Sequence, residues 1–334
     1  MAKNVFRCLS NKTNLLIEAG TGVGKSFAYL VPAILSCRKT VVSTASIALQ
    51  DQLAEKDLIF IQKTFPKKFS FGVLKGKNNY VCIKRVREFS QTSKTYLKFL
   101  EWLNKTKTGE KSNLPFVPEF WSNICGDSQD CNGRLCPFYN DCFYYRHFRD
   151  LYNTDILVVN HHLLAYDLVS EFNILPFHDQ LVVDEASEIE AAISRVMGSV
   201  LSYERFAWLL YRLKGLKIMV DPLFPRIEQF FKTNNGSIHP TTPIPIPITE
   251  GLHELKKMLD LNTIISTIKG FIKTSGNDEY TDKVETTINY IKILEADIDD
   301  FIGQDDSDKV FYMSTNNNLL ELKSELVEPR KHFE

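Results

Sequence analysis

The chain has 334 residues, 44% of them hydrophobic, which is enough for one large domain or two to three small ones. Its 23 Phe, 13 Tyr and 3 Trp exclude disorder as the main state, and its net charge of −1 excludes a uniformly basic nucleic-acid binder. No apolar run reaches the about 18 residues of a membrane span, and the N-terminus lacks the apolar core of a secretory signal. We therefore expect a cytoplasmic protein without a membrane partner, whose 7 Cys serve metal binding or burial rather than disulfides.

The first segment alternates predicted strands and helices. Leu15–Glu18 is expected to be a short strand that ends in a glycine-rich turn, and Lys25–Cys37 a helix with Pro32 inside it. Thr40–Thr44 has the β-branched composition of a second strand, and Ile47–Asp57 the pattern of a second helix. This alternation predicts an α/β fold with a parallel sheet covered by helices.

The turn between the first strand and helix has the sequence of a phosphate-binding loop. Glu18–Ser26 reads EAGTGVGKS, and its glycines let backbone N–H groups turn toward an anion at a helix N-terminus. Lys25 is predicted to contact the β- and γ-phosphates, and the Ser26 hydroxyl to bind Mg²⁺. The predicted nucleotide-binding residues of this loop are Ala19, Gly20, Thr21, Gly22, Gly24, Lys25 and Ser26.

A basic segment follows. Residues 63–111 contain 13 Lys/Arg and 3 Glu, a local charge of +10. This is either a solvated face or a surface for a phosphate backbone, and the cations of Lys75–Arg87 could guide DNA without reading its sequence. Tyr80, Phe143 and Tyr144 could stack on bases, although residues such as the last two more often belong to a core that shields a cluster.

Four cysteines form a candidate metal site. Cys131, Cys136 and Cys142 have the spacing C-x4-C-x5-C, and Cys82 lies 48 intervening residues upstream. Four thiolates suit either tetrahedral Zn²⁺ or a 4Fe–4S cluster. Cys125 is a fifth candidate, so the residue chemistry alone leaves the set of four open.

Two further buried strands are predicted at Asp155–Asn160 and Gln180–Asp184. The second delivers Asp184, which could hold Mg²⁺, and Glu185, which could orient or deprotonate the attacking water. With the phosphate loop, this pair makes nucleotide hydrolysis the leading prediction. His161, after the other strand, is interpreted as structural as readily as catalytic.

The last part is predicted to be mostly helical. Helical periodicity runs from about 190 to 308, and 11 acids against 3 Lys in residues 278–309 give a charge of −8. His239–Glu250 contains four Pro and is expected to be an extended connector. Val310–Met313 and Leu319–Val327 have strand-like patterns.

Taken together, these motifs resemble the N-terminal motor half of the DinG/XPD-like iron–sulfur DNA helicases of superfamily two. EAGTGVGKSFAYLVPA is similar to motif I of that family, VVSTASIALQDQL to motif Ia, which contacts single-stranded DNA, and VVDEAS to motif II. LKGKNNYVC and the cysteine group are similar to its cluster domain, and DILVVNHHLLAYDL to the segment before motif II. The motif II position that is usually His is Ser187 here, and the upstream glutamine motif is absent.

The resemblance implies a P-loop RecA-like sheet with helices on both faces, interrupted by two insertions. Its expected parts are a first motor part at 1–74, a 4Fe–4S cluster domain at 75–150, a second motor part at 151–190, a helical arch at 191–308 and return strands at 309–334. It also implies that Cys82, Cys131, Cys136 and Cys142 hold a 4Fe–4S cluster rather than zinc.

The activity that the resemblance implies is an ATP- and Mg²⁺-dependent 5′-to-3′ DNA helicase of DNA repair, acting on single-stranded or forked DNA. Since motif III and the second motor domain have no counterpart here, we expect an incomplete motor, with its missing half encoded separately, or a decayed or split helicase fragment. Two alternatives remain: a nucleotide- and zinc-binding DNA-binding protein without helicase activity, and a metabolic P-loop kinase. The kinase alternative leaves the cysteines and TASIALQ without a role.

Overall fold

The computed structural model describes residues 1–20, 22–89, 92–128, 131–170, 174–233, 244–275, 278–316 and 318–329. The chain divides into two compact units, Met1–Ile193 and Ser194–Glu334. Each unit has its own core, and the two are described separately below.

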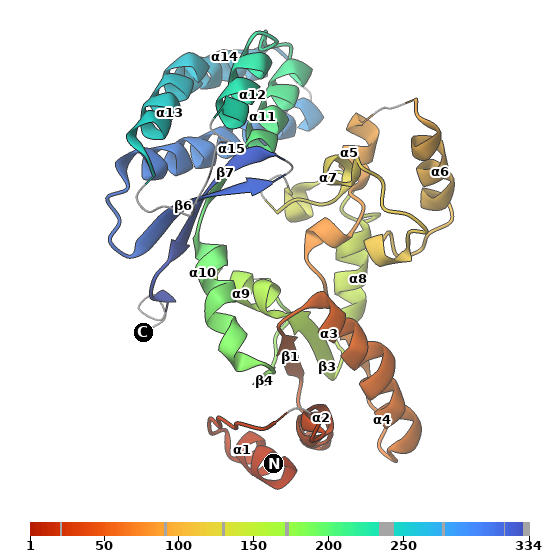
Figure 1. Cartoon of the computed structure of the whole chain (residues 1–334). Helices are drawn as coiled ribbons and strands as arrows, with labels where there is room; N and C mark the ends of the chain where they lie inside the picture. The colour runs from red at the N-terminus through yellow and green to blue at the C-terminus, as the bar shows by residue number, and fades with distance from the viewer. Residues whose placement is uncertain are drawn as a thin grey trace. The chain divides into compact units, whose positions relative to one another are not determined.

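Unit 1 is built on a four-stranded parallel sheet. Its strands are β1 (Thr40–Thr44), β2 (Phe71–Val73), β3 (Ile156–Asn160) and β4 (Gln180–Val183), in the order β2-β3-β1-β4 (Figure 1). Residue Thr44 lies opposite Asn160, so strands far apart in the chain end at the same edge of the sheet. The predicted α/β class and parallel sheet are confirmed.

Helices cover both faces of this sheet because alternate strand residues point to opposite sides. Val42 and Val158 pack in a core with helices α1 (Ala2–Asn11) and α2 (Lys25–Leu35). Val41 and Leu157 pack in a second core on the other face, with residues of α8 and α9.

The other helical elements of unit 1 follow in chain order. They are α3 (Ile47–Gln52), the π-helix η1 (Leu53–Leu58), α4 (Ile59–Thr64), η2 (Lys77–Asn79), α5 (Ile83–Glu88), α6 (Lys94–Leu103), η3 (Lys111–Asn113), α7 (Trp121–Ile124), η4 (Gly133–Leu135), α8 (Phe143–Leu151), α9 (His161–Val169), η5 (Ala186–Glu188) and α10 (Ile189–Met197), which runs into unit 2. The predicted helix at Ile47–Asp57 is therefore the start of a longer helical run through α3, η1 and α4.

The expected strand at Leu15–Glu18 does not form in the structure. The segment belongs to neither sheet, and Leu16 is 88% exposed. Among the described residues β4 is an edge strand that pairs only with β1, and the segment before the phosphate loop does not add to its free edge. Apolar composition indicates a preference for a strand but does not determine whether the backbone pairs with a neighbour.

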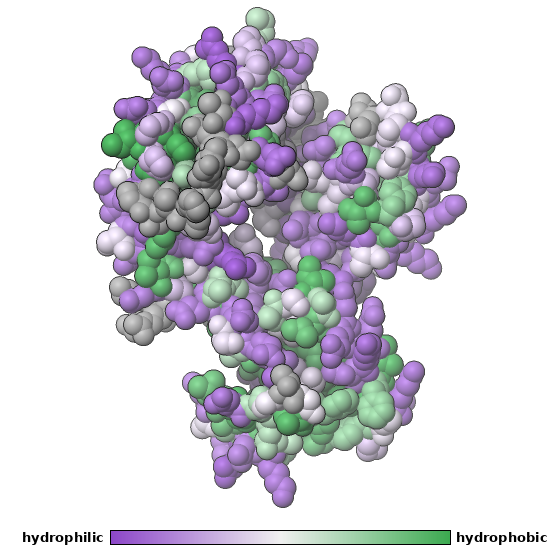
Figure 2. Space-filling view, in the orientation of Figure 1, coloured by the Kyte–Doolittle hydropathy of each residue, from purple (hydrophilic) through white to green (hydrophobic). Residues whose placement is uncertain are grey.

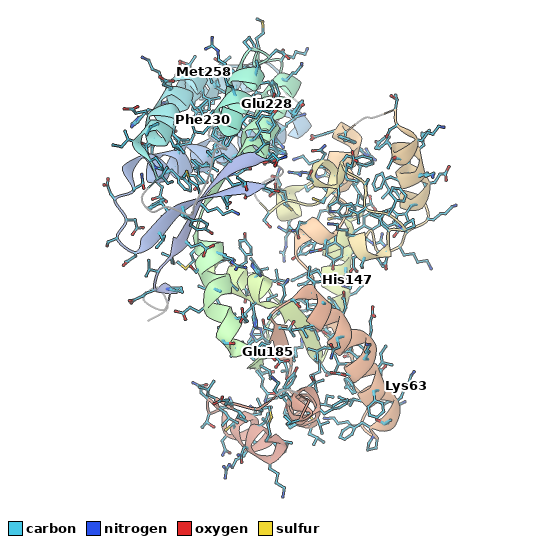
Figure 3. All side chains as sticks on the ribbon, in the orientation of Figure 1. Lys63, His147, Glu185, Glu228, Phe230 and Met258 are labelled. Carbon is cyan, nitrogen blue, oxygen red and sulfur yellow. The ribbon has the colours of Figure 1, made fainter. Side chains whose placement is uncertain are left out.

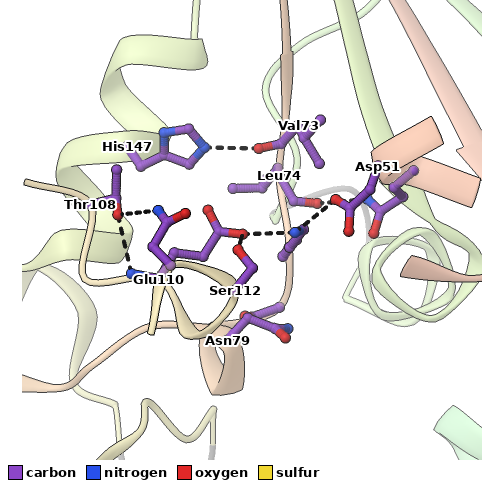
Figure 4. A network of polar contacts seen from close by, with 12 residues as sticks. Asp51, Val73, Leu74, Asn79, Thr108, Glu110, Ser112 and His147 are labelled. Atoms are coloured by element: carbon purple, nitrogen blue, oxygen red, sulfur yellow. Dashed lines mark hydrogen bonds and ion pairs between the residues drawn. The ribbon is translucent and has the colours of Figure 1, made fainter. Parts of the chain in front are cut away.

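A buried lysine joins the sheet to the segment that contains the cysteines (Figure 4). Lys75 follows β2, and its Nζ lies 2.8 Å from Asp51 Oδ1 and 2.7 Å from Glu110 Oε1. Burial lowers the pKa of Lys75, but its bonds to Asp51 and Glu110 raise it overall. Next to this ion pair His147 Nε2 bonds to the carbonyl of Val73 at 2.8 Å. The cation of Lys75 is thus neutralised inside unit 1, which removes it from the predicted DNA-contacting block.

We expect Lys75→Met to destabilise unit 1 by roughly 2–3 kcal/mol, because it leaves two carboxylates without their cation. Burial alone would raise the pKa of Glu110, but the bonds from Lys75 and Ser112 hold it below its usual value. The loss should therefore be constant between about pH 5 and pH 10 and shrink as pH falls through the Glu110 pKa. Urea unfolding at several pH values measures it, with the exposed Lys63→Met as control; equal effects of the two variants would contradict it.

Unit 2 is a helical bundle with a small antiparallel sheet. The helices are α11 (Tyr203–Gly215), α12 (Leu223–Thr233), α13 (Ile246–Leu259), α14 (Leu261–Ser275) and α15 (Asp278–Gly303). The sheet has the order β5-β7-β6, with β5 (Val200–Ser202), β6 (Lys309–Asn316) and β7 (Leu319–Leu326). One apolar core that includes Phe206, Phe231 and Phe301 joins helices and sheet.

Two expectations for this region are wrong. The strands at 309–326 do not return to the parallel sheet; they pair with each other and with β5, because alternate apolar side chains such as Leu320 and Leu322 complete the core of unit 2. The connector expected at His239–Glu250 is helical from Ile246 onward, since proline is well tolerated in a first helical turn. Residues 239–243 lie outside the described part of the chain.

In the described ranges, no helix combines the length and the apolar character that crossing a membrane requires.

Candidate functional site

The predicted catalytic residues meet beside the carboxyl ends of β1, β3 and β4. Lys25 begins α2, and its Nζ lies 2.8 Å from Oε1 of Glu185, which follows β4 and is labelled in Figure 3. This bond raises the pKa of Lys25. The structure thus brings together two residues 160 positions apart in sequence, with the lysine held by the carboxylate.

Both predicted Mg²⁺ ligands, Ser26 and Asp184, interact with the hydroxyl of Tyr29. Tyr29, one turn into α2, donates a hydrogen bond of 2.9 Å from its hydroxyl to Oδ2 of Asp184 and also interacts with Ser26. Burial and the Asp184 carboxylate raise the pKa of Tyr29, so this hydroxyl keeps its proton and acts as a donor. The N–H of Glu185 donates to the other Asp184 oxygen at 3.1 Å, and the carboxylate is held at both oxygens.

The phosphate loop has the backbone conformations that its glycines predict. Gly22 and Gly24 have φ values of 75° and 81°, in the region that favours glycine. Ala19 and Gly20 lead into the loop, whereas Thr21 lies outside the described residues. A cavity with about 1540 Å³ of empty space, part of it open to solvent, is lined by residues 15–19, Lys25, Tyr29 and 181–187.

The surface around the loop is unusually apolar. Hydrophobic side chains lie over the part of unit 1 that contains α1, α2 and α4 (Figure 2). Exposed members on these elements and on the loop segment include Phe6, Leu16, Val23 and Phe60. Of these four residues only Leu16 lines the cavity that contains Lys25.

Four of the five candidate cysteines line one cavity. Cys82, Cys131, Cys136 and Cys142 surround about 510 Å³ of empty space, part of it open to solvent. Cys82 precedes α5 and Cys142 precedes α8, so both stand at helix N-termini. No three His, Cys, Asp or Glu side chains among the described residues stand close enough to hold one ion directly.

The chemistry of these thiols fits a metal group. Burial raises the pKa of Cys136 and Cys142, and the neighbouring Cys131 raises both further, because adjacent thiolates repel one another. A metal ion or cluster relieves this repulsion and deprotonates its ligands. Cys125, in contrast, is packed in an apolar core with Trp121 and Ile124 and does not line this cavity.

The aromatic residues proposed for base stacking are buried. Tyr80 is 1% exposed, and Phe143 and Tyr144 are similarly inaccessible. Arg85 is also buried and pairs with Asp127 at 3.1 Å. The burial of Tyr80 contradicts its predicted contact with bases, whereas Phe143 and Tyr144 take the core role that was the other interpretation for them. The pairing of Arg85 with Asp127 likewise contradicts its predicted contact with the phosphate backbone.

A groove in unit 1 combines cationic side chains with exposed aromatic side chains. This is the combination that a surface for single-stranded nucleic acid requires. The groove encloses about 2620 Å³ of empty space, again partly open to solvent, and its wall includes the cations of Lys77, Lys111 and Arg134. Three of its aromatic residues are solvent-accessible: Tyr152, Tyr166 and Phe177, the last 71% exposed. Sequence reasoning missed these three because exposure of an aromatic side chain depends on packing between segments distant in sequence.

Comparison with curated proteins finds relatives named DinG or YoaA. No family model matches the chain. It is 34% identical over 217 residues to the ATP-dependent DNA helicase YoaA of Escherichia coli, covering 60% of this chain and 34% of that protein. It is 33% identical over 276 residues to the ATP-dependent helicase DinG of Mycobacterium tuberculosis, covering 73% and 41%. A Bacillus subtilis relative, the 3′-5′ exonuclease DinG, is 27% identical over 86% of this chain and 32% of its own length.

A solved XPD helicase structure is similar with a TM-score of 0.47 at 12% identity, over 97% of this chain and 53% of that one. The sequence matches confirm the resemblance, and the chain is similar in sequence to helicases named DinG and YoaA. It spans about a third to two fifths of the length of the curated relatives it matches.

Proposed function

We propose that this chain binds and hydrolyses ATP as the first motor domain of a DinG-type, 5′-to-3′ DNA helicase. The supporting observation is the convergence of Lys25, Ser26, Asp184 and Glu185 at the carboxyl end of a parallel sheet, where such folds bind ligands.

Each residue has a role that follows from its chemistry. The loop N–H groups and Lys25 bind the phosphates of ATP, and Lys25 exchanges Glu185 for the β- and γ-phosphates. Ser26 and Asp184 hold Mg²⁺, which neutralises developing charge on the phosphates. Glu185, released from Lys25, accepts a proton from the attacking water.

The four cysteines of the cavity, we propose, hold a 4Fe–4S cluster. Such a cluster would supply a rigid or redox-active element bound by four thiolates. Cys82, Cys131, Cys136 and Cys142 would be its ligands, while Cys125 contributes to the core beside it. On this proposal residues 75–150 form the cluster domain between two parts of the motor domain, and residues 191–308 correspond to a helical arch.

The groove beside the cysteines suits single-stranded DNA. Lys77, Lys111 and Arg134 could bind the phosphate backbone, and Tyr152, Tyr166 and Phe177 could stack on bases without reading their sequence. Forked DNA, which presents such a single strand, is the proposed partner.

The nucleotide site is tested by Lys25→Ala. Removing the phosphate-binding cation should weaken the affinity for a fluorescent ATP analogue about 10- to 100-fold, the range expected for a charge-assisted bond. Lys63→Ala, far from the loop in sequence and exposed, should bind as the wild type does. Equal affinities of the wild type and Lys25→Ala would contradict the proposed site.

A further inference from the structure

The buried His161 bonds to β1 and to the residue pair that follows β4. It begins α9, directly after β3, and is 1% exposed. Its Nδ1 lies 2.7 Å from the hydroxyl of Ser43 on β1. Its Nε2 lies 3.3 Å from the backbone carbonyl of Glu185.

The partners of the ring determine which nitrogen carries the proton. The Glu185 carbonyl can only accept, so Nε2 is protonated and donates to it. In the neutral ring Nδ1 is then an acceptor, and the Ser43 hydroxyl donates to it. Burial lowers the pKa of His161, in agreement with a neutral ring.

Hydrogen bonds connect Ser43 to both acidic residues, Asp184 and Glu185. The backbone carbonyl of Ser43 accepts from the N–H of Asp184 at 2.8 Å, while its side chain holds the Glu185 carbonyl through His161. Ser43 therefore fixes Asp184 directly and Glu185 indirectly, from one position on β1.

Glu185 needs such a constraint because its backbone is strained. Its φ of 52° and ψ of 51° are left-handed, a conformation that costs a residue with a Cβ about 1–2 kcal/mol. The Glu185 carbonyl also accepts from the N–H of Glu188 at 2.9 Å within its own turn, and His161 adds the bond that ties this turn to β1 through Ser43. The strain thus persists only while its neighbours hold it.

We propose that His161 is a positioning residue for ATP hydrolysis, which holds the strained backbone of Glu185 and so aims its carboxylate. The proposal rests on the proposed function of the same site. Because Ser43 lies in the VVSTASIALQ segment, the histidine also ties Glu185 to the strand that leads into α3.

The first test compares turnover with binding. His161→Ala should lower kcat for ATP hydrolysis about tenfold or more and change the affinity for Mg²⁺-ATP less than about twofold, as expected when only transition-state interactions are lost. Ser43→Ala should act in the same direction. The double variant should lose little more than His161→Ala alone, since both act through one chain of bonds. His178→Ala, whose ring bonds to the Pro176 carbonyl, should leave turnover unchanged.

The second test does not require activity. Nitrogen-15 NMR of the imidazole in the full chain should show a neutral ring protonated at Nε2, and Ser43→Ala should shift the Nδ1 resonance. A ring protonated at Nδ1 would overturn the proposal whatever the activity. So would unchanged turnover in His161→Ala while Glu185→Gln is inactive. If both His161→Ala and Glu185→Gln still hydrolyse ATP while the ring has the predicted tautomer, the role of Glu185 is overturned. The role of His161 is then overturned with it.

Discussion

Glu185→Gln is expected to reduce ATP hydrolysis by about 10²- to 10⁴-fold, the usual contribution of a general base. Glutamine keeps the shape of the side chain but cannot accept the proton of the attacking water. In the nucleotide-free protein the carboxylate is paired with Lys25 at 2.8 Å, and the neutral amide loses this attraction. Lys25 is then freer to bind phosphate, so ATP affinity should be unchanged or increased.

The measurement is phosphate release at saturating Mg²⁺-ATP, together with equilibrium binding of the nucleotide. Glu188→Gln is the matched control, because Glu188 lies one turn further on in η5 and outside the cavity that contains Lys25. Hydrolysis that survives in Glu185→Gln would show that another group activates the water.

Cys82→Ser is expected to abolish the iron–sulfur cluster, whereas Cys125→Ser should retain it. Cys82 lines the cavity with the three other candidate ligands, and serine is a poor ligand for this group compared with thiolate. Cys125 packs in an apolar core with Trp121 and Ile124 and does not line that cavity. Its replacement should lower thermal stability and leave the cluster intact.

Iron and acid-labile sulfide per chain, measured after anaerobic purification, distinguish the two variants. Loss of the cluster only in Cys125→Ser would overturn the ligand assignment. Colourless wild-type protein that contains zinc would instead support the zinc-binding alternative.

Part of the geometry of the candidate nucleotide site could be predicted from the sequence. Residues that share one short motif, such as Gly24 and Lys25, have fixed spacing, and the strand that contains Ser43 and the strand that precedes Asp184 are short β-branched or apolar segments. The pairing of Lys25 with Glu185 follows because parallel strands end at one edge of the sheet. The roles of these residues stay predictions until they are measured.

Predictions that depended on long-range packing were less successful. The cationic Lys75 looked like a DNA contact until the structure placed Asp51 and Glu110 beside it. Tyr80 looked accessible, and its burial depends on residues about 60 positions later, such as Tyr144. Leu15–Glu18 had the composition of a strand, but composition does not determine whether a segment pairs with the free edge of a sheet.

His161 shows why positioning residues are difficult to find in a sequence. Its two partners, Ser43 and Glu185, lie 118 residues before it and 24 residues after it. No spacing rule connects the three, and a histidine after a buried strand is commonly structural. Only the shared edge of the sheet brings them into one chain of hydrogen bonds.

The most direct test of the central claim is ATP hydrolysis by the purified chain with and without single-stranded DNA. We expect Mg²⁺-dependent hydrolysis that single-stranded DNA increases and that Glu185→Gln removes. Hydrolysis that is insensitive to DNA at concentrations where DNA binding is complete would contradict a DNA-dependent motor and favour a P-loop enzyme with a different acceptor.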